Sequence, residues 1–564
     1  MVTTLSTILR EITDDYLDNI DVNNPPTPKQ IEQEIFDLMR SRIAMENTIR
    51  EKGEKLRLPN SLSFSQIAAI MARLYPIVRV SFTEESTETD ADTLAIYQEA
   101  GENEGIYVTS EDEFRRIATQ YDYNLRTSEF EEVLTALRTN CKEWVPRKLR
   151  NNNPNLIAVN NGIFNYETKQ LMPFSPDYVF MCKSHVDYNP QATNITIHND
   201  EDGTDWDVET WMAELTDDPE ITQLLWEIIG AIIRPHQRWG KSAWFYSESG
   251  NNGKGTLCEL MRNICGKGAY TSIPIADFAK DFMLEPLIRT SAIIVDENDV
   301  GTYVDKVANL KAVITNDTVQ INRKFRIPIA YQFFGFSVQC VNEFPRIKDK
   351  SDSFGRRMLI VPFNKSFTGH ERKYIKNDYL HRKEVLEYCL YKVLNMNYDV
   401  LSEPKACTNA LNDYKTFNNP VKEFLDEILD QFTWDLVPFQ MLYALYQEWY
   451  RRVAPTGTIQ GRNTFINDVV AQLKTSDKWY CIDKSAQIKA SDRMDKPEPL
   501  ILQYNLKDWM NNTYHGSDPN VLCTYPHDAK QNYRGILRYI NGNVAQQTVQ
   551  ADDADDTDKP FDSK

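Results

Sequence analysis

The sequence predicts an α/β protein whose core is a parallel sheet flanked by helices, with an α+β region before the core and a helical domain after it. Three stretches predict this core. Residues 243–258 read as an apolar strand, a glycine-rich turn and a helix start. Residues 291–297 form an apolar strand that ends in two carboxylates, and residues 334–342 form a third strand that ends in an amide. Buried parallel strands have such continuous apolar runs, and α/β proteins bind ligands at the carboxyl ends of these strands.

The turn after the first strand has the chemistry of a phosphate cradle. Backbone N–H groups freed by its glycines can converge on an anionic oxygen, and Lys254 supplies a positive charge. The helix that begins near Thr256 adds the positive end of its dipole. The turn departs from the pattern G-x-x-x-x-G-K-[ST], because Glu248 replaces the first glycine and Gly255 follows the lysine. A simple turn rich in Asn and Gly is the alternative. The predicted phosphate-binding residues are Gly250, Asn251, Asn252, Gly253, Lys254, Gly255 and Thr256.

Polar side chains at the ends of the next two strands complete a predicted ATP site. Asp296 is placed to hold Mg²⁺ through water, and Glu297 to polarise the attacking water. Asn342 can orient that water or touch the γ-phosphate. A turn that begins at Asn342 before a proline is the alternative for this residue. The predicted cofactors are ATP and Mg²⁺.

The charge of the chain restricts how it can bind nucleic acid. A formal net charge of −19 argues against a protein that coats nucleic acid through its overall field, although it allows a local basic site. Cations and an aromatic residue gather between the second and third strands, and the alternative is a solvated turn whose Phe packs in the core. The candidate DNA-binding residues are Lys311, Arg323, Lys324, Phe325 and Arg326.

The remaining features predict a cytosolic protein of several domains. A chain of 564 residues is too long for one core, and its nine cysteines show no paired spacing, which favours a reducing compartment and no structural zinc. The N-terminus lacks a signal peptide, and the longest apolar run, 224–233, is interrupted by Glu227. Asp90 and Asp92 have the spacing of a primase metal site, but they lie in a polar run that favours a loop. The predicted domains are a mostly helical region 1–90, an α+β domain 91–200, an ATPase core 201–370, a helical lid with a winged-helix-like domain 371–545, and a disordered acidic tail 546–564.

Apolar residues at helical spacing predict the helices within these domains. Residues 63–75 predict a short amphipathic helix that begins at Ser63, and residues 205–240 predict two helices before the glycine-rich turn. Residues 419–429, 441–452 and 463–473 predict three helices, and a strand-like end near 479–482 predicts a hairpin.

Two parts of the chain resemble known families. Residues 156–176 have a hairpin around Asn160-Asn-Gly162, followed by Leu-x-Pro-x-Ser-Pro, and residues 95–190 resemble the domain that precedes the motor in poxvirus and phage primase-helicases. Residues 95–370 contain, in order, Asn-Gly-Lys in the turn, strand-Asp-Glu, a Lys-x₁₂-Lys-Phe hairpin, strand-Asn-x-x-Pro and Arg-Arg-strand-Pro-Phe. This set resembles the superfamily-three helicases of viruses, phages and plasmids. Within them, its pattern is most similar to the primase-helicase C-terminal modules of phages and mobile elements.

The resemblance implies an AAA+ type P-loop hexamer. In it, Lys254, Asp296, Glu297 and Asn342 serve one subunit's ATP, and Arg357 reaches the ATP of the neighbour, with Arg356 as the alternative. Loops that carry Lys324 and Phe325 would line a channel and grip DNA. Gly255 departs from the Ser or Thr that usually binds Mg²⁺, and Thr256 is expected to substitute for it.

The predicted function is that of a ring-shaped, ATP-driven DNA helicase of a phage or mobile element, without its own primase domain. Expected partners are single-stranded or forked DNA, further copies of the chain and a separate primase or other replication proteins, in the cytoplasm of a bacterial host and with no membrane. A replication initiator that binds and remodels origin DNA, and an ATP-dependent scaffold, are the alternatives. The winged helix could read origin DNA or only pack.

Overall fold

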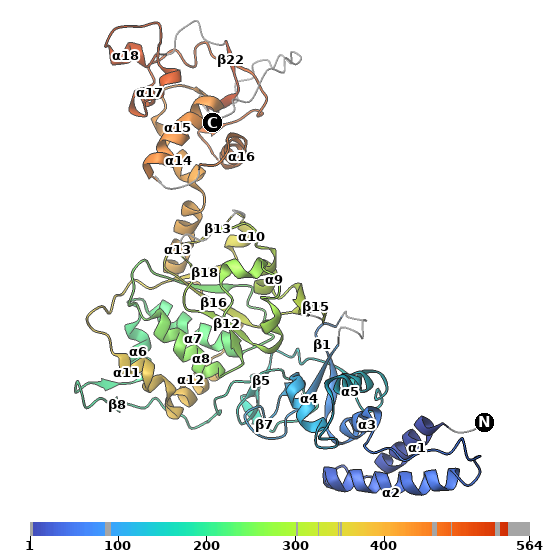
Figure 1. Cartoon of the computed structure of the whole chain (residues 1–564). Helices are drawn as coiled ribbons and strands as arrows, with labels where there is room; N and C mark the ends of the chain where they lie inside the picture. Colours follow the sequence, from blue (N-terminus) through green and yellow to red (C-terminus); the bar gives the residue numbers. More distant parts are fainter. Residues whose placement is uncertain are drawn as a thin grey trace. The chain divides into compact units, whose positions relative to one another are not determined.

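The computed structural model describes residues 4–84, 92–299, 303–324, 326–347, 349, 352–453, 459–474, 476–524 and 531–539. The chain divides into two compact units, 1–411 and 412–564 (Figure 1). It is a mixed α/β protein with a parallel sheet and many helices. The predicted acidic tail, 546–564, lies outside the described residues.

The first unit begins with helices that pack on a small sheet. Ser63 and Gln66 form a capping box at the start of α3, which confirms the helix predicted there. Strand β1 pairs with β2 and β4, so the boundary predicted at residue 90 falls inside one sheet of order β3-β2-β1-β4. Asp92, once weighed as a metal ligand, is buried and ion-paired with Arg147 at 2.7 Å. These elements are α1 Leu5–Asp18, α2 Pro28–Glu46, α3 Phe64–Leu74, β1 Ile77–Ser81, β2 Thr93–Tyr97, β3 Tyr107–Val108, α4 Glu111–Ala118, α5 Thr127–Thr139 and β4 Arg147–Leu149.

The segment that follows contains the predicted hairpin. Strands β5 and β6 are joined by the two-residue turn Asn160-Asn161, and β7 pairs with β6 after a second turn. Two helices then precede the core, as predicted, because apolar residues recur there at helical spacing. The elements are β5 Leu156–Val159, β6 Gly162–Asn165, β7 Gln170–Met172, β8 Ile197–His198, β9 Asp205–Trp206, α6 Val208–Glu214 and α7 Pro219–Ile233.

The core is a five-stranded parallel sheet of order β11-β12-β16-β10-β18. Strands β12, β16, β10 and β18 are buried, as their apolar runs predict, whereas the short edge strand β11 is half-buried. Helices α7, α8 and α12 share one hydrophobic core with the sheet. The strands and helices of this part of the chain, those outside the sheet included, are β10 Ser242–Tyr246, α8 Lys254–Cys265, β11 Tyr270–Thr271, η2 Ile275–Ala279, η3 Glu285–Arg289, β12 Ala292–Val295, β13 Tyr303–Val304, α9 Ala308–Thr315, β14 Thr318–Arg323, β15 Arg326–Gln332, β16 Phe336–Val341, β17 Arg346–Ile347, α10 Asp352–Gly355, β18 Met358–Pro362, α11 Lys373–Asn377, η4 Tyr379–His381, α12 Lys383–Asn395 and α13 Lys405–Phe417, in which the boundary between the units falls.

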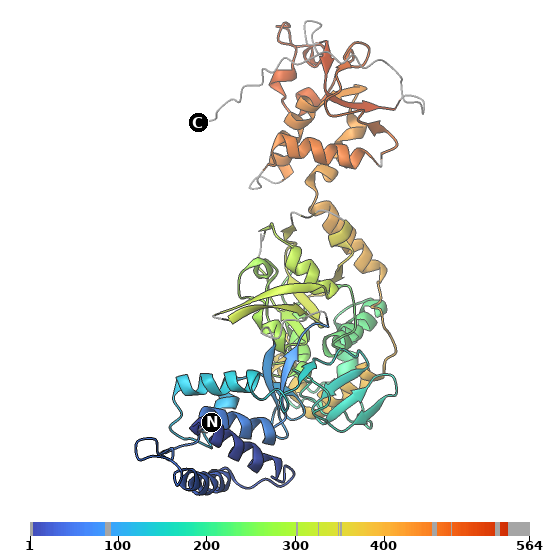
Figure 2. The same cartoon turned by 90° about the vertical axis from the view of Figure 1, so that its right-hand side faces the viewer.

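A β-hairpin stands apart from this sheet. Among the described residues, strands β14 and β15 pair with each other, antiparallel, and with no further strand, and they lie between β12 and β16 in the chain (Figure 2). The hairpin predicted around residues 311–326 is therefore present.

The second unit has its own core of tryptophans and aliphatic side chains. Three predicted helices are present, but the predicted hairpin near 479–482 is wrong, because β20 pairs with the distant β23 in a sheet of order β19-β23-β20. The boundary predicted at 370 also differs, because residues 371–411 belong to the first unit. The elements are α14 Pro420–Ile428, η5 Leu429–Gln431, β19 Leu436–Pro438, α15 Phe439–Val453, α16 Arg462–Leu473, β20 Trp479–Tyr480, β21 Ile488–Lys489, α17 Leu500–Gln503, η6 Lys507–Trp509, α18 Pro519–Leu522, β22 Asn532–Tyr533 and β23 Gly535–Arg538.

No helix among the described residues combines the length and apolar character needed to span a bilayer.

Candidate phosphate-binding site

The glycine-rich turn connects the carboxyl end of β10 to the amino end of α8. Its left-handed residues are Asn251, at φ 54°, and Gly253, at φ 86°. A Cβ at Gly253 would lie 2.6 Å from the Leu215 side chain, so both the backbone angle and the close approach require glycine there. Gly250 lies in open space with no positive φ, and Gly255 would place a Cβ no nearer than 4.0 Å to another residue, so neither needs to be glycine for conformational reasons.

Asn252 braces the turn from within. The residue is 4% exposed, its side-chain nitrogen donates to the carbonyl of Ser249, and its Oδ1 accepts from the backbone N–H of Lys254 at 3.3 Å. These bonds fix the direction in which α8 starts. Asn252 therefore supports the turn, and its side chain is already engaged inside the loop.

Lys254 lies between the carboxyl ends of β10 and β16. Its Nζ donates to Oδ1 of Asn342 at 2.8 Å, to the carbonyl of Val341 at 3.2 Å and to that of Ser247 at 3.4 Å. The residue is 5% exposed, and burial lowers the pKa of its ammonium group. The structure thus brings together two of the predicted site residues, Lys254 at the start of α8 and Asn342 directly after β16.

The strand order explains why this crevice is open to a ligand. From β10 the chain crosses to β11 at one edge of the sheet, and from β16 it crosses over β10 to β18 at the other edge. Connections that leave two adjacent parallel strands in opposite directions create a crevice at their carboxyl ends, where open α/β sheets bind ligands. Lys254 occupies that crevice.

The predicted acids follow β12, on the far side of β16. Both carboxylates of Asp296 and Glu297 are exposed. Asp296 makes a two-pronged ion pair with Arg262 of α8, with nitrogen–oxygen distances of 2.7 and 2.8 Å. A metal ion at Asp296 would share that carboxylate with the guanidinium group of Arg262.

Asn298, which the sequence analysis missed, positions this edge. It is 8% exposed, and its side chain donates to Gln339 and to the carbonyl of Cys340 on β16 and accepts from the N–H of Ile275. Two of these bonds tie the end of β12 to its neighbouring strand β16, and the third ties it to η2. Asn298 is a single residue after two acids and belongs to no repeating pattern of the sequence, so this role could not be predicted.

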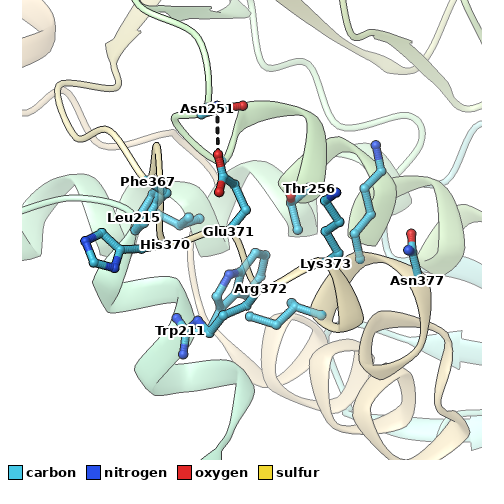
Figure 3. A pocket seen from close by; sticks show the side chains of 13 residues that line it. Trp211, Leu215, Asn251, Thr256, Phe367, His370, Glu371, Arg372, Lys373 and Asn377 are labelled. Atoms are coloured by element: carbon cyan, nitrogen blue, oxygen red, sulfur yellow. Dashed lines mark hydrogen bonds between the residues drawn. The ribbon is translucent and has the colours of Figure 1, made fainter. Parts of the chain in front are cut away.

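A cavity of about 260 Å³ lies beside the turn. Apolar rings and side chains of Trp211, Leu215 and Phe367 line one part of it, and Lys373 and Lys376 of α11 line another. In Figure 3, Glu371 points to Asn251, whose side-chain nitrogen donates to Glu371 at 3.1 Å. The two lysines were missed, because α11 reaches the turn only through the tertiary fold.

Thr256 faces this cavity rather than the acids after β12. It shares the lining with Arg372, Lys373 and Lys376, and this cationic surrounding favours an anion over Mg²⁺. No hydrogen bond between described residues joins Thr256 to Asp296. The structure thus places Thr256 in the lining of this cavity, whereas Asp296 is paired with Arg262, and their joint binding of a metal ion stays a prediction.

The two candidate finger arginines differ in what holds them. Arg357 donates from Nη1 to the carbonyl of Ser353 and to its hydroxyl, the latter at 2.8 Å. Arg356 is exposed, and its guanidinium group has no hydrogen-bond or ion-pair partner among the described residues, although its backbone N–H donates to the carbonyl of Asp352. Arg356 is therefore the more accessible of the two in this structure, and which of them reaches a neighbouring subunit stays a prediction.

The predicted DNA-binding cations lie along the hairpin and next to it, and most are engaged. Lys311 of α9 pairs with Asp349 at 2.7 Å. Arg323 donates to the carbonyl of Ile327 at 2.8 Å and to the hydroxyl of Thr93 at 3.2 Å, and burial lowers its pKa.

The tip of the hairpin is more open. Arg326 pairs with Glu111 of α4. Lys324 is exposed. Phe325 lies outside the described residues, so its predicted contact with DNA stays a prediction. The hairpin is thus anchored to the N-terminal region through Thr93 and Glu111, a contact that the sequence analysis did not foresee.

Comparisons with known proteins cover both halves of the first unit. Residues 29–230 match a family described as "D5 N terminal like", and residues 245–357 match one described as a family of unknown function, DUF5906. Two solved apo structures of the NrS-1 C-terminal region are similar to the chain. The first is 14% identical, with a TM-score of 0.36, and covers 71% of this chain and 83% of its own. The second is 13% identical, with a TM-score of 0.39, and covers 74% and 94%.

No curated protein matches the sequence. The "D5 N terminal like" match covers the region, 95–190, for which a resemblance to viral and phage primase-helicases is predicted, and it extends that region in both directions. The N-terminal part of the chain, up to helix α7, is therefore similar to the family of D5 N-terminal-like proteins.

Proposed function

We propose that this chain is an ATP-driven DNA helicase of the superfamily-three type, with an AAA+ type P-loop core that assembles as a homo-oligomeric ring of six subunits during phage or mobile-element replication. The observation that carries the proposal is the position of Lys254. Its buried ammonium group is held by three oxygens at the carboxyl ends of β10 and β16, in the crevice where the first turn of α8 begins.

This arrangement fits a triphosphate. Burying an ammonium group is costly unless it is paired, and the partners of Lys254 are neutral oxygens. Anionic phosphate oxygens beside the same ammonium group would form stronger, charge-assisted hydrogen bonds. The free N–H groups at the start of α8 and its dipole add to the attraction.

The cavity beside the turn suits the rest of the nucleotide. The apolar surface of Trp211, Leu215 and Phe367 would pack against the base or ribose, while Lys373 and Lys376 would face phosphate oxygens. Asp296 is the residue that would hold Mg²⁺, and the ion would neutralise charge on the phosphates. Arg262 would then lose or share its partner.

Glu297 and Asn342 are the residues proposed to act on the attacking water. The exposed carboxylate of Glu297 can accept a hydrogen bond from water, and Asn342 can orient the water while its Oδ1 accepts from Lys254. Arg356 is exposed and lies two residues before β18. It is proposed to reach the ATP of a neighbouring subunit, with Arg357 as the second candidate.

The hairpin is proposed to grip a DNA strand through Lys324. It connects α9 to β16, the strand that carries Asn342, so a shift at the nucleotide site can move it. A replication initiator is the second candidate function. It is favoured by the anchoring of Arg323 and Arg326 on Thr93 and Glu111, because an anchored hairpin could hold DNA without moving along it.

Hydrolysis of ATP with and without single-stranded DNA, together with sizing of the protein with ATP, tests the proposal. The proposal expects magnesium-dependent hydrolysis that single strands stimulate, and a ring-sized assembly. Absence of hydrolysis under all these conditions would refute it.

A further inference from the structure

A second cavity of the first unit lies at the opposite edge of the core sheet. It has a volume of about 400 Å³ and is lined by residues of the N-terminal region and of the core. Residues 267–271 lead into and form β11, and residues 286–290 lead into β12, so the cavity faces the amino ends of these two parallel strands. The glycine-rich turn follows the carboxyl end of β10 in the same sheet. This amino-edge cavity is therefore separate from the proposed nucleotide site.

The side chains of the amino-edge cavity that can be charged near neutral pH are all basic. They are Lys183, His185, Lys267 and Arg289, and no Asp or Glu occurs among the described residues that line it. The chain has a formal net charge of −19, so a cavity lined by basic side chains and by no acidic ones differs from the average composition of the protein. Such a wall attracts anions.

Two of these bases are positioned by the fold. Lys183 is 3% exposed and donates from Nζ to the carbonyl of Glu104 at 2.8 Å. Nearby carboxylates of Glu102 and Glu104 favour its charged form, although burial has the larger effect and lowers its pKa. The ring of His185 packs so closely on Gly266 that a Cβ there would lie 2.3 Å away. Burial lowers the pKa of His185, so it enters the cavity as a neutral ring that can donate one hydrogen bond.

The other two bases are exposed and come from different segments. Lys267 lies between two glycines with positive φ, after the end of α8, and Arg289 ends η3. Neither has a carboxylate partner among the described residues. Their charges are therefore available to a ligand, whereas Lys311 and Arg326 near the hairpin are already paired.

We propose that the amino-edge cavity binds a phosphate group of a single DNA strand, with Lys267 and Arg289 as its principal contacts. The volume exceeds what one inorganic phosphate needs, and Tyr270 in the lining offers a ring on which a sugar or base can pack. Backbone binding by cations needs no sequence readout and gives a salt-dependent affinity. The inference rests on the proposed function in one respect, namely that the bound polymer is single-stranded DNA.

Lysine acetylation followed by mass spectrometry tests the site on the full chain. An oligo-thymidine strand should protect Lys267 from acetylation, while Lys142, an exposed lysine outside the cavity, should react as before. Inorganic phosphate serves as the second probe. Protection by phosphate but not by the strand would assign the cavity to a free phosphate compound and overturn the assignment to DNA. Unchanged labelling of Lys267 with both probes would overturn the site itself.

Binding measurements provide the matched control. Lys267→Ala combined with Arg289→Ala should reduce the salt slope of single-strand binding by about 0.7, as expected when one phosphate group is no longer neutralised, and Lys142→Ala should leave it unchanged. ATP hydrolysis without DNA should remain at the wild-type rate in the double variant. If that hydrolysis is intact and the slope is unchanged, the cavity is not a DNA contact. If the wild-type protein neither hydrolyses ATP nor binds DNA, the proposed function fails, and with it the assignment of the cavity to DNA. Protection of Lys267 by inorganic phosphate would then still show that the cavity binds anions, and unchanged labelling would show that it does not.

Discussion

Replacement of Lys254 by alanine removes the only group that places a full positive charge in the crevice between β10 and β16, as far as the described residues show. In a buried site, one preorganised donor aimed at developing charge contributes about 3–4 kcal/mol to the transition state. Hydrolysis of ATP should therefore fall by about 10²–10³-fold or more. Lys280→Ala is the control, because the Lys280 side chain is 64% exposed and forms an ion pair with its helical neighbour Asp277. The assay is phosphate release at saturating ATP.

The same substitution should leave the protein folded. Alanine deprives the oxygens of Val341 and Asn342 of a donor, which costs about 1–3 kcal/mol, but it also removes a buried ammonium group whose desolvation opposes folding. Because burial lowers the pKa of Lys254, the unfolded chain holds this proton to higher pH than the folded chain. Wild-type stability should therefore gain as pH rises from the lowered pKa towards the ordinary value of 10.5, and Lys254→Ala should lack this gain in thermal melts. Phosphate release by a folded Lys254→Ala protein at the wild-type rate would refute the assignment of the site.

Three further substitutions test separate parts of the proposal. Glu297→Gln should bind ATP but not split it, since an amide cannot polarise water as a carboxylate does, and normal hydrolysis would place the base elsewhere. Arg356→Ala should keep nucleotide binding and lose turnover, and mixing it with Lys254→Ala protein should partly restore hydrolysis if the two residues serve one shared site. If Arg357→Ala behaves in this way and Arg356→Ala does not, the bond to Ser353 must open in the ring. Lys324→Ala should abolish DNA-stimulated hydrolysis and reduce the salt slope of single-strand binding by about one per subunit engaged, with basal hydrolysis unchanged. Full stimulation in that variant would move the DNA grip to another surface.

The sheet and the turn could be predicted because their signals are local. Continuous apolar runs indicated the strands that became β10, β12 and β16, and the apolar spacing after residue 205 indicated the two helices before them. Lys254 and Asn342 were expected to serve one ATP site, since carboxyl ends of parallel strands meet at one edge, but their direct hydrogen bond was not predicted. These inferences needed only the pattern of neighbours along the chain.

The parts that failed depend on contacts between distant residues. A domain boundary was predicted at residue 90, although β1 pairs with β2 across it, because the sequence of a short strand does not indicate which strand it pairs with. Strand β20 pairs with β23, which lies beyond the segment 481–534, whereas the prediction placed residues 479–482 in a local hairpin. Sequence spacing likewise gave no sign that Glu111 would hold Arg326.

The residues around the turn show the same limit. Lys373 and Lys376 approach it because α11 packs on the core near α8, and Arg262 reaches Asp296 from the later turns of α8. Thr256 was expected to join Asp296 at a metal ion, but the rotation of α8 between neighbouring positions turns it to the cationic cavity. Motif spacing specifies which residues lie near the turn but not the direction of each side chain.

Strand displacement on forked DNA tests the central claim most directly. The protein should separate the fork in the presence of ATP and Mg²⁺, Glu297→Gln should bind the fork without separating it, and Lys254→Ala should be inactive. Separation of strands by none of these proteins, combined with tight binding of wild-type protein to duplex origin fragments, would contradict a helicase and favour the replication initiator.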